Sequence, residues 1–220
     1  PDGNFSDFVK PVGKKENTNT LEVLTDWRVW VLALAYSICF GMEITFDNVA
    51  ALYFVDTFNF DQKAAGLLAG LFGFMNIFAR ALGGIFADRI GRIYGISGKS
   101  WLLAGFLVLE GIGLYFFSNT LTITYAIVAM LSFALFLKMA NGATYAITPF
   151  INSKNVGLVA GIVGAGGNIG GMLMGFLFKS ENISYARAFQ FIGAAAVIVG
   201  FLVALTRFSK KSKSEIKIQE

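Results

Sequence analysis

The chain has 220 residues, of which 55% are hydrophobic and 15% charged, and it contains 25 glycines and 23 phenylalanines. Runs of about 20 apolar residues recur along it, which is the composition of a membrane protein and not of a soluble domain. One cysteine and no histidine exclude an intramolecular disulfide and a Cys/His zinc site. The formal net charge of +4 resides in tails and loops, which favours membrane orientation over nucleic-acid binding.

The first 20 residues are polar, rich in Lys, Asn and Thr, and have no apolar signal core. We interpret residues 1–26 as a cytoplasmic linker in the later part of a longer protein. Residues 27–207 are predicted to form an all-α bundle of six spanning helices, followed by a basic cytoplasmic tail at 208–220. The expected helices are 27–54, 63–87, 100–117, 121–148, 155–178 and 186–206.

Basic residues gather on one side of this topology. They precede or open the first helix, join the second to the third and the fourth to the fifth, and fill the C-terminal tail. The opposite loops offer only Lys63, Lys179 and Arg187. The positive-inside rule therefore predicts that both ends of this segment are cytoplasmic. We expect a multi-pass protein of the plasma (inner) membrane.

The second helix carries a single arginine, Arg80, within an apolar run. A charge in hydrocarbon is costly unless a cavity, a partner or a ligand compensates it. At about 1.5 Å per residue, Arg80, Tyr36 and Asn168 come to similar depths near the middle of the membrane. Because a guanidinium can donate two parallel hydrogen bonds, it suits a small planar oxyanion. The sequence thus predicts an anion site, and the alternative is an ion pair of Arg80 with Glu43, Glu110 or a carboxylate outside this chain.

The fifth helix has a stripe of small residues at alternating spacings of four and three. Its members are Gly157, Gly161, Gly164, Asn168, Gly171 and Gly175, and the stripe is widened by Gly166, Gly167 and Gly170. Small residues on one face allow close helix packing, and this accounts for most of the glycines. The same face can narrow a cavity around a small ligand, with Asn168 as a hydrogen-bond donor. The two interpretations are compatible.

Other ionisable residues lie inside the predicted membrane segments. Glu110 and Lys138 come near mid-depth on consecutive helices, so we predict a structural ion pair between them. Glu43 and Asp47 lie one turn apart in the outer half of the first helix. We predict that both are solvated in an outward vestibule, and the alternative is a proton relay or an outer gate.

The run GIFADRIGR, residues 84–92, has the pattern G-x-x-x-D-R-x-G-R, with Gly84, Asp88, Arg89, Gly91 and Arg92 at the pattern positions. It resembles the loop motif of the major facilitator superfamily. Within that superfamily the chain, from about residue 27 to 208, resembles the nitrate/nitrite porter family. This more specific likeness rests on FARALGG at 78–84 and on the glycine-rich signature GIVGAGGNIG at 161–170.

The resemblance implies the C-terminal half of a twelve-helix transporter whose N-terminal six-helix half lies outside this chain. The family's anion-binding arginine would be Arg80, and its substrate-contacting aromatic residue would be Tyr36. The signature glycines would be Gly164, Gly166 and Gly167. Nitrate or nitrite would lie at mid-membrane between Arg80 and an arginine of the other half, and the halves would rock about it to alternate its exposure.

The resemblance also implies that Asp88, Arg89 and Arg92 latch the cytoplasmic side through charge pairs and helix ends. Two other functions stay open. One is a major facilitator carrier for a different solute, such as an organic anion or a sugar. The other is a six-helix channel or scaffold that assembles with copies of itself. An enzyme is the least supported class, because the sequence has no nucleophile with a base, no metal set and no cofactor loop.

Overall fold

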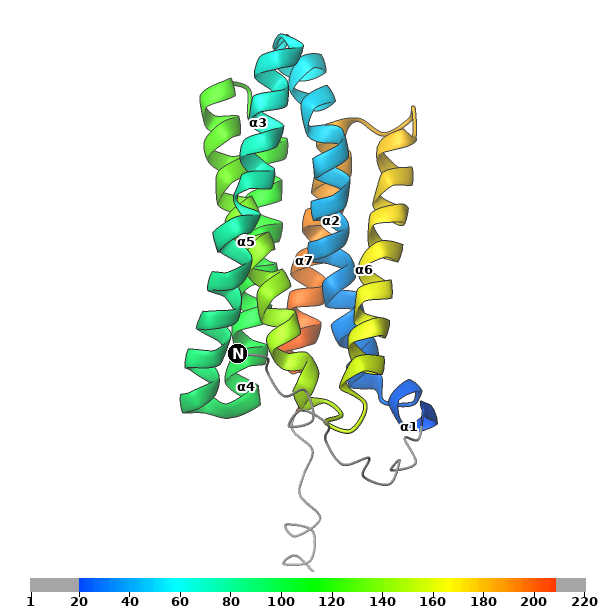
Figure 1. Cartoon of the computed structure of the whole chain (residues 1–220). Coiled ribbons are helices and arrows are strands. Elements are labelled where there is room, and N and C mark those ends of the chain that lie inside the picture. The colour runs from blue at the N-terminus through cyan, green and yellow to red at the C-terminus, as the bar shows by residue number, and fades with distance from the viewer. Residues whose placement is uncertain (1–19, 209–220) are drawn as a thin grey trace, which may run out of the picture.

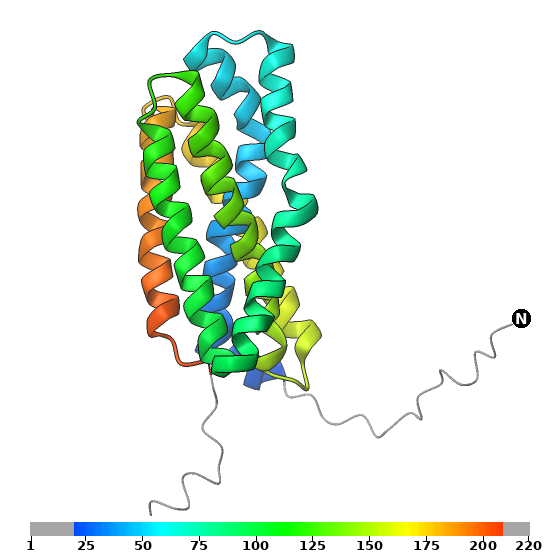
Figure 2. The same ribbon diagram turned by 90° about the vertical axis from the view of Figure 1, so that its left-hand side faces the viewer.

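The computed structural model describes residues 20–208, which form a bundle of long helices roughly parallel to one axis (Figures 1 and 2). The helices are α1 (Thr20–Leu24), α2 (Trp27–Phe58), α3 (Gln62–Phe74), α4 (Asn76–Ser118), α5 (Ile123–Ile147), the 3-10 helix η2 (Thr148–Phe150), α6 (Val156–Lys179) and α7 (Tyr185–Leu205). The predicted all-α class is confirmed. The predicted linker and tail lie for most of their length outside the described residues.

Five stretches of the described residues are long and apolar enough to span a membrane, and one of them, Gln62–Ser118, has 57 residues. This stretch doubles back within α4 at Gly95, whose φ of 64° and ψ of −155° are not helical (Figure 2). We call residues 76–94 and 96–118 the first and second arms of α4. With this reversal, six helical segments of the described residues cross the bundle from one end to the other, as the sequence predicted. They are α2, α3 with the first arm of α4, the second arm of α4, α5, α6 and α7.

Local sequence explains where the helices begin and end. The side chain of Asp61 caps α3 by accepting a hydrogen bond from the backbone N–H of Ala64 at 2.8 Å. Asn59 ends α2 in the left-handed conformation, which asparagine tolerates better than most residues. The predicted second helix, 63–87, is interrupted at Met75 and then continues to the turn at Gly95. The loop motif therefore lies on helix α4 and not in a loop.

Glycines set how closely the helices pack. The main packed pairs are α4 with α5, α2 with α6, and α4 with α7. A Cβ atom on Gly83 would lie 2.1 Å from the carbonyl oxygen of Met139, and one on Gly142 would lie 2.0 Å from that of Arg80. Backbone therefore touches backbone where the first arm of α4 crosses α5, as small residues permit between membrane helices.

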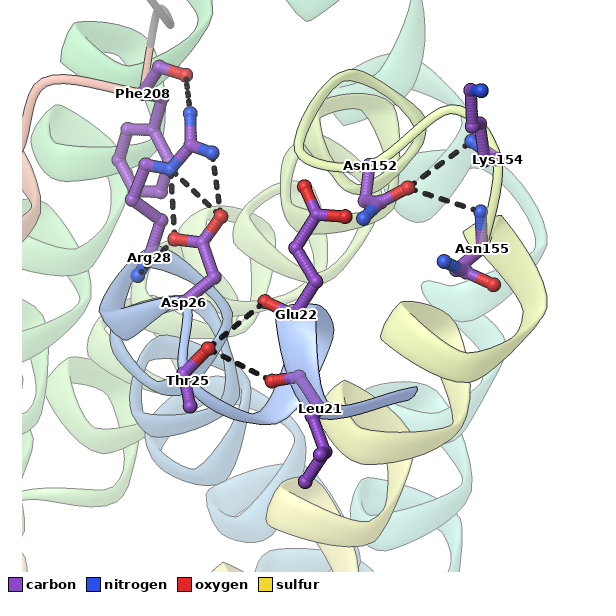
Figure 3. A network of polar contacts seen from close by, with 9 residues as sticks. All are labelled: Leu21, Glu22, Thr25, Asp26, Arg28, Asn152, Lys154, Asn155 and Phe208. Atoms are coloured by element: carbon purple, nitrogen blue, oxygen red, sulfur yellow. Dashed lines mark hydrogen bonds and ion pairs between the residues drawn. The ribbon is translucent and has the colours of Figure 1, made fainter. Parts of the chain in front are cut away.

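Arg28 joins the start of α2 to the residues that follow α7 (Figure 3). Its Nε donates to Asp26 Oδ1 at 2.8 Å, and its Nη2 donates to Asp26 Oδ2 at 2.5 Å. Its Nη1 donates to the backbone carbonyl of Phe208 at 2.7 Å. Arg28 and Phe208 are both buried. One side chain thus holds together two segments that are 180 residues apart in the chain.

Replacing Arg28 by methionine is expected to destabilise the bundle by roughly 1–3 kcal/mol, because hydrogen bonds to a charged group at a buried site are lost. The measurement is the midpoint of thermal unfolding of the purified protein. The neighbouring exposed Arg207, replaced by methionine, is the matched control and should leave the midpoint unchanged. Equal midpoints for the two variants would show that the contact with Phe208 adds no stability.

Candidate anion-binding site

Arg80 lies in the first arm of α4, and its side chain is 40% exposed. Its Nη2 donates to Oε2 of Glu43, in α2, at 3.0 Å. Its Nε is buried and has no hydrogen-bond partner among residues 20–208. The guanidinium carbon lies 5.5 Å from the centre of the Phe40 ring, within the range of a cation–π contact. The guanidinium is therefore held at one nitrogen while part of it stays accessible.

Glu43 is buried at the centre of this site and accepts hydrogen bonds from four side chains of α4 and α5. Oε1 accepts from Asn76 Nδ2 and from Lys138 Nζ, the latter at 3.4 Å. Oε2 accepts from Arg80 Nη2 and from Asn141 Nδ2, the latter at 2.5 Å. Glu43 thus positions Arg80 and is also its counter-ion.

One prediction about these charges is wrong, and one alternative is observed. Glu43 is buried and not solvated in a vestibule, and it forms with Arg80 the ion pair considered above as the alternative. The neighbouring Asp47 does have an exposed side chain, as predicted for a residue in a vestibule. A rise of about 1.5 Å per residue gives the depth of a side chain but not which way its helix is rotated. The rotation of α2 turns Glu43 inwards and leaves Asp47 accessible.

The predicted ion pair of Glu110 with Lys138 is also wrong. Lys138 is fully buried, pairs with Glu43, and lies with Nζ 4.1 Å from the centre of the Phe72 ring. Glu110 is fully buried too, and neither of its oxygens has a hydrogen-bond partner in the described part of the chain. Similar depth did not bring the two together, because the rotation of α5 directs Lys138 towards α2.

Tyr36 and Arg80, which were predicted to lie at similar depths, are connected through Phe40, a residue that sequence reasoning missed. Tyr36 is buried and stacks on Phe40, with ring centres 4.9 Å apart and planes 8° apart. Its other neighbour is Tyr145 of α5, in an edge-to-face contact at 5.0 Å. The spacing in the sequence could have predicted the contact between the two rings, because Phe40 follows Tyr36 by four residues and so lies on the same face of α2. Phe40 is the ring that contacts the guanidinium.

Three glycines of α6 lie directly against α2. A Cβ on Gly166 would lie 2.7 Å from Ala33 O, and one on Gly170 would lie 2.1 Å from Ser37 O. A Cβ on Gly167 would meet the rings of Tyr36 and Phe40 at 2.6 and 2.7 Å. The packing interpretation therefore holds for the residues that widen the stripe. Gly167 also lies beside the aromatic pair that supports Arg80.

Most Cβ positions of the stripe itself have open space around them. Apart from the backbone of α6 itself, no atom of residues 20–208 lies within 4 Å of the Cβ position at Gly157, Gly161 or Gly175. At Gly164 the nearest atom to that position is Tyr145 Oη, at 3.3 Å. Asn168 is exposed, and its Nδ2 donates to the carbonyl of Gly164 in its own helix at 3.1 Å. A direct contact of Asn168 with a ligand stays a prediction.

The loop motif is tied to α5 and η2 by a lysine that sequence reasoning missed. Lys99 Nζ donates to Asp88 Oδ1 at 2.6 Å and to the carbonyl of Ala146 at 3.1 Å, and lies 4.5 Å from the centre of the Phe150 ring. A Cβ on Gly91 would lie 2.4 Å from Cε of Lys99, so a larger residue there would displace the end of the Lys99 side chain. The other pattern positions on this arm are Gly84, which is half-buried, and Arg89 and Arg92, which are exposed.

A family model described as Major Facilitator Superfamily matches residues 32–220. The six crossings, the motif on α4 and this match show that the chain belongs to the major facilitator superfamily of membrane transporters. Within the superfamily it belongs to the nitrate/nitrite porter family, as its arginine helix and glycine-rich signature predicted.

Three relatives illustrate this placement. The chain is 33% identical to high affinity nitrate transporter 2.5 of Arabidopsis thaliana over 94% of its length. It is 38% identical to nitrate transporter 2.2 of Chlamydomonas reinhardtii and 30% identical to the nitrate/nitrite transporter NrtP of a Picosynechococcus strain, each over 84%. It covers 42%, 37% and 36% of these three proteins, so the chain spans about two fifths of the length of the curated relatives it matches.

Proposed function

We propose that this chain is the C-terminal half of a transporter that carries nitrate or nitrite across the membrane by alternating access. The observation that carries the proposal is Arg80, a part-exposed guanidinium in an apolar bundle, whose Nε has no hydrogen-bond partner among residues 20–208 and which has an aromatic ring beside it. Such a group can bind a small planar anion through charge-assisted hydrogen bonds. The names of the relatives and the partial coverage of their length support the same conclusion.

In this mechanism Glu43 accepts a hydrogen bond from one nitrogen of Arg80, and the anion accepts hydrogen bonds from the guanidinium N–H groups that remain accessible. An arginine of the N-terminal half closes the site from the other side. Gly164 and Gly167 keep side chains out of the space between α6 and the aromatic residues, and Gly166 allows α6 to approach Ala33 of α2. Tyr36 stacks on Phe40. The two halves then rock about the bound anion, which is exposed to one side of the membrane at a time.

The orientation belongs to the same proposal. The end of the bundle that carries the Gly95 turn, η2 and the contact of Arg28 with Phe208 faces the cytoplasm of a plasma (inner) membrane protein. Residues 1–26 then form a cytoplasmic linker between the halves, and residues 208–220 form a cytoplasmic tail. The pair of Asp88 with Lys99 lies at that cytoplasmic end, where Arg89 and Arg92 are free to contact the other half.

The test is uptake of labelled nitrate by the full-length protein in cells that have no nitrate uptake of their own. We expect saturable uptake that nitrite inhibits and a large organic anion does not. Preloading the cells with unlabelled nitrate should accelerate entry of the labelled nitrate. The reason is that the binding site of an alternating carrier returns to the outside faster when it is loaded. Inhibition by an organic anion or a sugar would favour another solute, and uptake that neither saturates nor responds to preloading would favour a channel.

A further inference from the structure

Lys138, in α5, is a buried cation that the proposed mechanism does not use. Its side chain is completely inaccessible, so it does not contact an anion bound at Arg80. Its Nζ donates to Oε1 of Glu43 at 3.4 Å and lies 4.1 Å from the centre of the Phe72 ring. Lys138 can therefore influence the anion site only through its charge and through Glu43.

Glu43 pairs with two cations through separate oxygens. Oε1 pairs with Lys138 at 3.4 Å, and Oε2 pairs with Arg80 at 3.0 Å. The Lys138 side chain is fully buried, whereas the Arg80 side chain is 40% exposed, so Arg80 is the cation that an anion can reach. No other acidic residue among residues 20–208 forms an ion pair with either cation. One negative charge thus lies between two positive charges.

The charges of these three side chains sum to +1. Without Lys138, the carboxylate of Glu43 would neutralise Arg80, and the sum would be zero. Charges interact more strongly within a protein than in water, so one unit of charge beside the site changes the affinity for an anion at least about tenfold. A sum of +1 matches a monovalent anion, and nitrate and nitrite are monovalent.

We propose that Lys138 is a positioning residue for the anion site. It compensates the charge of Glu43, so that the positive charge of Arg80 remains available to a monovalent anion. Glu43 can then fix the guanidinium through a hydrogen bond without cancelling its charge. The inference rests on the proposed function for the identity of the anion.

The cluster allows a variant that removes both buried charges and keeps the sum at +1. This is the double variant Glu43→Gln/Lys138→Met. The amide oxygen introduced at position 43 can accept from Arg80 Nη2 and Asn141 Nδ2, as Oε2 of Glu43 does. The amide N–H group can donate to Oδ1 of Asn76 once the Asn76 amide turns over. That oxygen is buried and has no hydrogen-bond partner among residues 20–208. The double variant therefore preserves the position of Arg80.

The test is calorimetric titration of the purified full-length protein with nitrate at one fixed pH. We expect Lys138→Met to weaken nitrate binding at least about tenfold and the double variant to bind within about threefold of wild type. A merely structural role of Lys138 would reduce the number of sites titrated and leave the affinity of each unchanged. The control is Lys179→Met, at an exposed lysine at the end of α6, which should bind nitrate as wild type does.

Wild-type affinity in Lys138→Met overturns the inference, and so does a double variant that binds nitrate as weakly as Lys138→Met. Either result leaves nitrate transport standing, whereas absence of nitrate binding by wild type refutes the proposed function. In that case thiocyanate, another monovalent anion, replaces nitrate in the same titrations. Thiocyanate binding that weakens in Lys138→Met and recovers in the double variant supports the inference, and any other result overturns it.

Should Lys138→Met fail to fold, the double variant decides the question, because it buries no unpaired charge. Nitrate affinity close to that of wild type supports the inference. A loss of about tenfold or more overturns it.

Discussion

Lysine in place of Arg80 is expected to lower nitrate uptake by the full-length transporter by about 10- to 100-fold at low nitrate. Lysine keeps the positive charge and can still pair with Glu43, but it loses the planar fork that binds an oxyanion through two nitrogens. One hydrogen bond to a charged group contributes about 1.5–3 kcal/mol, which corresponds to that range of affinity. Initial rates of labelled nitrate uptake, measured over a range of nitrate concentrations, provide the test.

The control is Arg187→Lys, at an exposed arginine at the start of α7, which should transport as wild type does. Because Arg80 also belongs to the buried cluster around Glu43, both variants are compared at equal amounts of monodisperse protein. Wild-type uptake by Arg80→Lys at every nitrate concentration would leave the ion pair with Glu43 as the sole role of Arg80.

Alanine in place of Gly170 is expected to destabilise the bundle by roughly 1–3 kcal/mol, as overpacking of a close contact does. Its Cβ would lie 2.1 Å from the carbonyl oxygen of Ser37, and backbone atoms cannot move aside as the end of a flexible side chain can. The separation of α2 and α6 must therefore increase, which disturbs the contacts of Gly166 and Gly167 with α2. Thermal unfolding followed by size-exclusion chromatography measures the loss.

The same helix offers a matched control. At Gly175 no atom lies within 4 Å of the Cβ position, so Gly175→Ala introduces no clash within this half. It should be neutral or slightly stabilising, since alanine favours a helix over glycine by up to about 1 kcal/mol. If Gly170→Ala and Gly175→Ala unfold at the same temperature, the close packing of α2 against α6 does not limit stability.

Much of the fold was predictable because it depends on properties that are local in the chain. The length of each apolar run matches the thickness of a bilayer, so six crossings and their order follow without tertiary information. Asn59 and Gly95 lie between the predicted helices, and the structure ends α2 at the first and reverses α4 at the second. The family motifs are visible in the sequence itself, and the depth of Arg80, obtained by counting residues from the helix ends, stays a prediction.

The partners of the buried charges were decided by the tertiary structure alone. Counting residues places Glu43, Glu110 and Lys138 at their depths, but whether two side chains meet depends on how each helix is rotated and how closely it approaches its neighbour. The glycine contacts at Gly83 and Gly142 bring the first arm of α4 against α5, so that Arg80 and Lys138 both reach Glu43. Glu110 has no hydrogen-bond partner among residues 20–208. The sequence could not predict this, because apolar helices with similar hydrophobicity on all faces carry no local signal for their rotation.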